Sequence, residues 1–204
     1  MVKRNKLQKW RLRKHASNLT EAKRLKVISY QITLIKNSLR SFVYFRELDR
    51  LVKADDYFCK ATKFAHFQLF VTGWCMCFGQ KRTESTHWRF SSSGHSEFKR
   101  KLFYELNIGG REFSEYVKSM LAVRNKLLSH TDINVEILSI PNFDTALSAQ
   151  IYLYNYLKGE LLKIPQVLHI EVLSIETWLD NLHDEAGSIV ESTHAATQKL
   201  PQYH

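Results

Sequence analysis

The sequence predicts an all-α fold: a single-domain helical bundle of five or six helices. Apolar residues recur at three- and four-residue steps in several long stretches, which is typical of amphipathic helices. The 204 residues include only seven Gly and three Pro, which is few for the many turns of an all-β fold. Hydrophobic residues make up 44% of the chain, enough for one domain with a buried core.

The first two helices are predicted over the first 80 residues. From residue 20 the apolar residues between Leu25 and Phe42 follow helical spacing, which predicts one helix of roughly 30 residues or two with a kink near Ser41. The next helix runs from Tyr57 to about Phe78, with Asp55-Asp56 as its N-terminal signal. Because this helix is apolar around nearly its whole circumference, we expect it to be central and buried.

The rest of the chain alternates helices with polar connections. Residues 79–94, rich in Ser, Thr, Lys and Arg, predict a loop. Ser96 is predicted to cap a helix that Gly109-Gly110 ends, and Ser174 to cap the last helix. The later helices are predicted over residues 96–107, 111–129, 144–163 and 175–193. The apolar segments 134–140 and 167–173 predict no sheet.

Positive charge is concentrated at the N-terminus. The net charge is +10, and the first 26 residues contain ten Lys and Arg against one acid, Glu21. We therefore predict a basic arm over residues 1–18, a helical domain over 19–198 and a short tail over 199–204. The arm is a candidate for contacts with nucleic-acid phosphates, and a solubilising tail is the alternative. Its candidate residues are Lys3, Arg4, Lys6, Lys9, Arg11, Arg13 and Lys14.

Cysteine and histidine spacing indicates neither disulfides nor a metal site. The three Cys, at 59, 75 and 77, form no disulfide framework and no CxxC pair, so we expect buried, reduced thiols and a cytoplasmic protein. No spacing matches a zinc site and no cofactor motif is present, so we expect neither metal nor cofactor. No stretch of about 18 apolar residues predicts a membrane span, and the start lacks the apolar run of a secretory signal. A transit peptide is the alternative for the basic start.

A charged residue on an apolar face marks the candidate site. In the helix predicted from residue 111, Phe113, Val117 and Met120 share one face, and Arg124 falls within it. A buried guanidinium is costly unless it has a partner. Arg124 therefore predicts one of two arrangements. Either it is structural, as an ion pair with an acid such as Glu160 or Glu176 or as an arginine that snorkels at the edge of the apolar face, or it faces an anion in a pocket or interface.

His130 is the expected chemical partner of Arg124. Arg124-Asn125, followed after four residues by His130, resembles the R-x4-6-H motif of the HEPN superfamily. The segment Trp74-Cys75-Met76-Cys77-Phe78-Gly79, followed by Thr86-His87-Trp88, is similar to a signature of the abortive-infection U-type (AbiU-like) branch of that superfamily. The resemblance covers roughly residues 20–198.

The resemblance implies a metal-independent endoribonuclease that acts as a toxin or phage-defence effector. It implies that His130 is a general acid or base and that Arg124 stabilises charge on the RNA phosphate, with Asn125 orienting the His or binding the phosphate. His87, Trp88 and Asp132 are accessory candidates. Trp88 is expected to be a hydrophobic anchor. Asp132 occupies the position where some members carry a Tyr that a nucleotidyltransferase-type antitoxin modifies.

The resemblance further implies a composite site across a homodimer. On a regular helix Arg124 and His130 point roughly 120° apart, so they converge only if the helix frays near Ser129 or if a second copy supplies the missing group. The face that carries Phe113, Val117 and Met120 would then form the contact. The alternative is a non-catalytic module of the same fold that binds RNA or a defence complex, with Arg124 structural. A third hypothesis is an interacting partner held by an antitoxin.

Overall fold

A computed structural model describes residues 21–51, 56–79, 86–92, 94–129, 141–164 and 174–197 of the protein. Across these ranges the chain forms six α-helices and one short 3-10 helix, without any strand. The predicted all-α bundle is therefore confirmed. The predicted arm and tail lie outside the described residues, so the proposed domain boundaries stay a prediction.

The observed helices follow the predicted segments closely. They are α2 (Glu21–Leu51), α3 (Tyr57–Phe78), the 3-10 helix η1 (Trp88–Phe90), α4 (His95–Glu105), α5 (Gly110–Ser129), α6 (Phe143–Leu161) and α7 (Ile175–Thr197). Helix α2 is one continuous helix, which confirms the first of the two alternatives for this segment. Ser41, the expected kink position, is buried within it. Helix α7 continues past the predicted end at Thr193, to Thr197.

Two of the predicted N-caps are confirmed and one is wrong. The Asp56 carboxylate accepts the backbone N–H of Cys59 at 3.0 Å and caps α3. The Ser174 hydroxyl accepts the backbone N–H of Thr177 at 3.1 Å and caps α7. Ser96 does not cap α4, because that helix begins one residue before it and Gly94 occupies the cap position.

The turn between α4 and α5 differs from the prediction. Gly109-Gly110 is the expected stop, yet neither glycine has a positive φ. Instead α4 ends at Glu105, and Asn107 adopts φ 49°, in the left-handed region that Asn tolerates better than most residues. Gly110 is the first residue of α5. The chain reverses between the two helices without a left-handed glycine.

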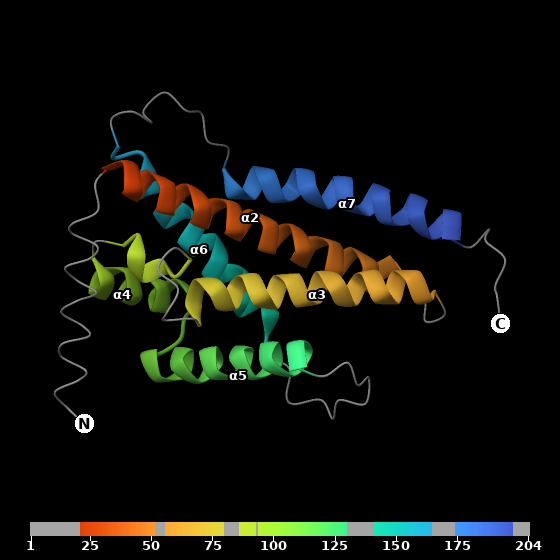
Figure 1. Ribbon diagram of the computed structural model, residues 1–204, viewed down its shortest axis with the longest axis horizontal. Coiled ribbons are helices and arrows are strands. Elements are labelled where there is room, and N and C mark those ends of the chain that lie inside the picture. Colours follow the sequence, from red (N-terminus) through yellow and green to blue (C-terminus); the bar gives the residue numbers. More distant parts are fainter. Residues whose placement is uncertain are drawn as a thin grey trace.

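The helices are stacked around α2. As Figure 1 shows, α2 lies between α7 and α3, α5 packs on the other side of α3, and α6 crosses behind α2 and α3. The crossing of α2 and α3 is close at Gly73, where an added Cβ would lie 2.7 Å from the Ser38 Cβ. The Ser38 hydroxyl donates to the Phe70 carbonyl at 3.0 Å and accepts from Gln150 of α6 at 2.9 Å. A glycine is therefore required where these three helices meet.

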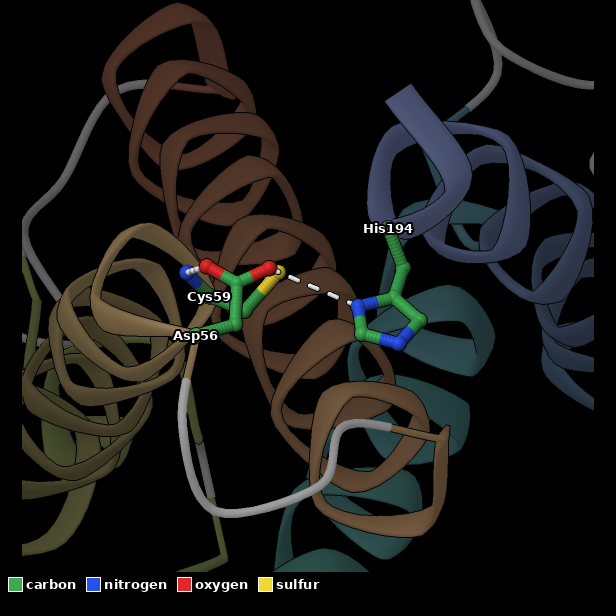
Figure 2. A group of neighbouring side chains, drawn as sticks. All are labelled: Asp56, Cys59 and His194. Carbon is green, nitrogen blue, oxygen red and sulfur yellow. Dashed lines mark hydrogen bonds and ion pairs between the residues drawn. The ribbon is translucent and has the colours of Figure 1, made fainter. Parts of the chain in front are cut away.

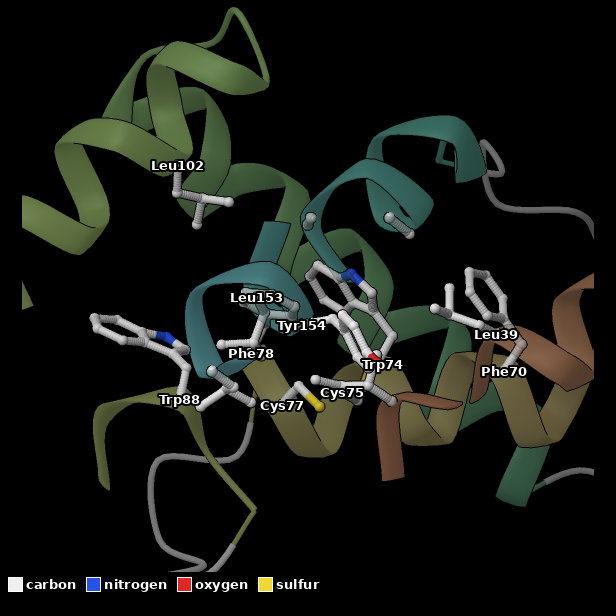
Figure 3. Close-up of a cluster of buried hydrophobic side chains, with 14 of the residues drawn as sticks. Leu39, Phe70, Trp74, Cys75, Cys77, Phe78, Trp88, Leu102, Leu153 and Tyr154 are labelled. Carbon is white, nitrogen blue, oxygen red and sulfur yellow. The ribbon is translucent and has the colours of Figure 1, made fainter. Parts of the chain in front are cut away.

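Trp74 lies at the centre of the core. Its side chain is fully buried, and its ring lies 5.0 Å from the Phe78 ring and 5.5 Å from the Tyr116 ring of α5, centroid to centroid. Leu153 and Tyr154 of α6 approach it from another side (Figure 3). Burial of one large aromatic side chain is worth several kcal/mol, so this cluster fixes α5 and α6 against α3.

Helix α3 is not buried along its whole length, contrary to the prediction. Most residues from Phe70 to Phe78 are enclosed, but Phe58 is 56% exposed and Leu69 is 59% exposed. The helix is apolar around its circumference, yet α2 and α5 together cover only part of it. Only the packing of the neighbouring helices decides which apolar residues of α3 are covered.

All three cysteines are buried free thiols, as expected. Burial raises the pKa of Cys75 to about 12 and also raises that of Cys77. Among the helices of the described residues, none combines the length and the apolar character that crossing a membrane requires.

Candidate functional site

Arg124 lies near the end of α5 with one donor group unpartnered. The guanidinium donates from Nη2 and Nε to the Asn125 side-chain oxygen, at 2.8 and 3.2 Å. The Nη1 atom is buried and has no hydrogen-bond partner among the described residues. The positive charge also acts on the buried Cys75 thiol of α3, whose pKa it lowers against the larger effect of burial. A buried cationic donor without a partner is costly, which points to a missing acceptor.

The predicted acidic partners of Arg124 are engaged elsewhere. Glu160 accepts from Arg24 of α2 and from Lys163. Glu176 accepts from Asn155 of α6 at 3.4 Å. The ion pair between Arg124 and either of these acids is therefore wrong. Arg124 has no acidic partner in the described part of the chain.

The apolar face beside Arg124 is already covered within one chain. Met120 is fully buried and Phe113 nearly so, both in the main core cluster, and Val117 packs against that cluster. Helix α3 covers this face. The surface expected to form a dimer contact is thus not free. The homodimer itself stays a prediction, now without that support.

A groove of about 790 Å³ opens beside Arg124. Its walls come from η1, α4, α5 and the C-terminal end of α3. Four of its lining residues are cationic and none is acidic; the cations are Arg89, Lys99, Lys118 and Arg124. The end of α3 at Phe78 and Gly79 also lines it, so the negative end of the helix dipole faces these cations. Because its lining holds four cations and no acid, the groove offers a positive surface suited to an anionic ligand.

Arg89 places its charge over an aromatic ring in one wall. The guanidinium carbon lies 5.4 Å from the Trp88 ring centroid. Partial burial lowers the pKa of Arg89 from its ordinary value, and an arginine still keeps its charge at neutral pH. Because Trp88 packs beneath it, Arg89 presents a weakly hydrated cation to the groove.

His87 and Trp88 hold the wall of the groove in place. His87 is 1% exposed; its Nδ1 accepts the Arg89 backbone N–H at 3.2 Å, and its Nε2 lies 3.3 Å from the Phe78 carbonyl. The ring therefore caps η1 and ties it to the end of α3. Trp88 is 3% exposed and stacks on Phe98 of α4, with ring centroids 4.5 Å apart. The expectation that Trp88 is a hydrophobic anchor is confirmed.

The structure places some predicted site residues and leaves others out. Asn125 is exposed, and its side-chain oxygen accepts two hydrogen bonds from Arg124. His130 and Asp132 lie outside the described residues, as do all the candidate residues of the basic arm, and their roles stay predictions. Sequence reasoning missed Lys99 and Lys118 as groove residues. Helical spacing gave no signal for Lys118, because on the α5 helical wheel it lies roughly 120° from Arg124.

Comparisons of the chain with protein-family models, with curated proteins and with solved structures find no match. The HEPN resemblance therefore remains an expectation from the sequence, and the chemistry of the groove has to be argued from its residues.

Proposed function

We propose that the chain is a metal-independent endoribonuclease, a toxin or phage-defence effector, which cuts RNA at the cationic groove with Arg124 and His130. The observation that carries the proposal is the buried, unpartnered Nη1 of Arg124 at the edge of a groove lined by cations and by no acid. An RNA phosphate supplies the missing acceptor. Its negative charge also matches the other cations of the groove.

The groove favours phosphates over bases as its main contact. Trp88, the aromatic residue of the motif, is covered by Phe98 and is not free to stack on a base. The cations come from η1, α4 and α5, so they are spread along the groove and suit several phosphates of one strand. A backbone-directed contact of this kind predicts weak sequence preference.

The proposed chemistry assigns one role to each residue. His130, six positions after Arg124, takes the proton from the ribose 2′-OH, which then attacks the neighbouring phosphate. Arg124 stabilises the negative charge that develops on the phosphate oxygens. Asn125 holds two donors of the Arg124 guanidinium and so fixes its orientation. The bond from phosphorus to the 5′-oxygen breaks and that oxygen takes a proton from solvent, so the products are a 2′,3′-cyclic phosphate and a 5′-OH end. No metal takes part in the reaction.

One observation favours a second candidate, a non-catalytic RNA-binding or defence-complex module. The Nε and Nη2 donors, the pair that commonly grips a phosphate with two hydrogen bonds, both point at Asn125. In this candidate Arg124 contributes charge and Nη1 only, and the groove retains RNA without cutting it. A homodimer, or an antitoxin or nucleotidyltransferase-type partner, is compatible with either candidate.

Cleavage of single-stranded RNA tests the proposal. We expect Arg124→Ala and His130→Ala each to reduce the cleavage rate by on the order of 100-fold or more. Cleavage should persist in EDTA, and DNA of the same sequence should stay intact because it lacks the 2′-OH. Arg111→Ala is the matched control, since Arg111 is on the same helix, 91% exposed and paired with Glu115.

The outcomes separate the candidates. Wild-type chain that binds RNA without cutting it supports the second candidate. Full activity in both site variants, or loss of activity on chelation while circular dichroism stays unchanged, contradicts the nuclease proposal. A toxin or defence effector should also arrest growth when expressed, and the His130→Ala chain should not.

A further inference from the structure

Three side chains with metal-binding atoms meet where the start of α3 packs against the end of α7. They are Asp56, Cys59 and His194, and Figure 2 shows all three pointing into the same space between the two helices. A carboxylate oxygen, the Cys59 sulfur and a His194 ring nitrogen all lie within 4.8 Å of one another. No other trio of His, Cys, Asp or Glu in the described residues meets this spacing.

The spacing of these atoms suits a tetrahedral ion. The Asp56 Oδ2 and His194 Nδ1 atoms are 3.4 Å apart, which is long for a hydrogen bond. Two ligands bonded to one tetrahedral Zn²⁺ at about 2.0–2.3 Å lie about 3.3–3.8 Å apart. The Asp–His pair therefore already has the separation that a shared zinc ion requires, and the Cys59 sulfur lies within 4.8 Å of both atoms.

Helix capping accounts for only one of the two carboxylate oxygens of Asp56. Oδ1 accepts the Cys59 backbone N–H at 3.0 Å, as any aspartate N-cap does. Oδ2 faces His194 and accepts the Thr197 hydroxyl at 2.6 Å. The Cys59 side chain, 1% exposed, lies against this carboxylate, and its thiol hydrogen-bonds to it.

A second histidine of α7 also pairs with an acid, but without a thiol beside it in the part of the chain that the structure describes. His183 Nδ1 lies 3.4 Å from a Glu47 carboxylate oxygen of α2, the same separation as in the His194–Asp56 pair. No cysteine accompanies that pair in the described residues. His183 is also 48% exposed, against 24% for His194, so the pair with the thiol is the more enclosed one.

We propose that Asp56, Cys59 and His194 form a structural Zn²⁺ site that fastens the end of α7 to the start of α3. A thiolate, an imidazole and a carboxylate in tetrahedral spacing are a ligand set typical of zinc. Water fills the fourth position, and Thr197 donates its hydroxyl to the ligating carboxylate. Binding releases the Cys59 thiol proton to solvent as the zinc–sulfur bond forms, so affinity rises with pH.

The site goes beyond the proposed function and does not depend on it. The helical rise from Cys59 to Cys75, the α3 residue that the charge of Arg124 reaches, is about 24 Å. A zinc ion here is thus too far from the groove to take part in RNA chemistry. Its expected effect is on stability alone, because it binds the folded chain and not the unfolded one.

Cobalt titration of the untagged, chelator-treated full chain tests the site. Co²⁺ should bind in one equivalent and give intense visible bands of a tetrahedral ion, with a near-ultraviolet thiolate charge-transfer band. Zn²⁺ should displace Co²⁺, abolish the visible bands and the charge-transfer band, and raise the melting temperature of the chain. Cys59→Ser and His194→Asn should each weaken Co²⁺ binding by at least about 100-fold. Removal of a residue that only hydrogen-bonds to a metal ligand has a smaller effect. His183→Asn and Cys75→Ser are the matched controls and should bind as the wild type does.

Two further measurements keep the test decisive. Circular dichroism establishes that each variant is folded, and alkylation of Cys59 in the wild-type chain should be slower with Zn²⁺ than without it. Absence of the thiolate band in folded wild-type chain overturns the proposal, as does an unchanged spectrum in Cys59→Ser. RNA cleavage is measured separately, so loss of the zinc site and loss of nuclease activity are distinguishable.

Discussion

The two halves of helix α3 differ in burial and in the chemistry that surrounds them. In the second half Trp74 and Phe70 are fully buried, whereas in the first half Phe58 and Phe64 are about half exposed and Cys59 is the buried residue. The first half begins at an acid, a thiol and an imidazole, and the second ends at a groove lined by cations. Each end thus carries the charge that stabilises its helix dipole.

A helix that is apolar around its whole circumference can still differ in burial and in charge between its two ends. The sign of charge at each end follows a local rule, since the N-terminus favours carboxylates and the C-terminus favours cations. Which residues provide that charge depends on α7 at one end and on η1, α4 and α5 at the other. Substitutions that act on one half and spare the other therefore test the comparison.

The largest expected effect is on the buried half. Trp74→Ala removes a fully buried aromatic ring from the core and should lower the free energy of unfolding by about 3–5 kcal/mol. Phe58→Ala on the exposed half should change it by less than about 0.5 kcal/mol. Urea denaturation of both variants measures the difference. Equal losses of stability would mean that the exposed half is covered in solution.

A smaller effect is expected at the crossing of α2 and α3. Gly73→Ala places a Cβ 2.7 Å from the Ser38 Cβ, and Ser38 is held by its hydrogen bonds to Phe70 and Gln150. We expect a loss of about 1–3 kcal/mol from overpacking. Gly159→Ala in α6 is the control, because nothing lies within 4 Å of its added Cβ, and it should stabilise the chain by about 0.5–1 kcal/mol. Thermal unfolding of both variants shows whether each substitution raises or lowers the stability. An increase in stability for Gly73→Ala would contradict the close crossing.

The smallest effect concerns the charge of the groove. Lys118→Glu should weaken binding of single-stranded RNA by roughly tenfold and flatten the slope of log affinity against log salt by about 0.7 for each phosphate that the variant no longer neutralises. Lys60→Glu makes the same change of charge on the exposed half of α3 and serves as the control. Fluorescence anisotropy at several salt concentrations measures both. Equally weakened binding in the two variants would indicate an effect of net charge and not of the groove.

Several features followed from short-range patterns. Helical spacing predicted the α-helices within a few residues, because backbone hydrogen bonds and side-chain periodicity are local. The caps at Asp56 and Ser174 followed from side chains that bond the next turn of the chain. The stop at Gly109-Gly110 failed because Asn107 can also adopt the left-handed conformation, and local preference does not choose between them.

The tertiary structure alone decided the rest. Nothing in residues 86–129 reveals that Arg89 of η1 and Lys118 of α5 line one groove, because a helix pattern gives its faces and not its neighbours. Asp56 and His194 are brought together only because α7 packs on α2 beside the start of α3. The sequence by itself determined helices, caps and one arginine on an apolar face. Packing decided which atoms meet, because side-chain contacts between distant segments depend on how the helices cross.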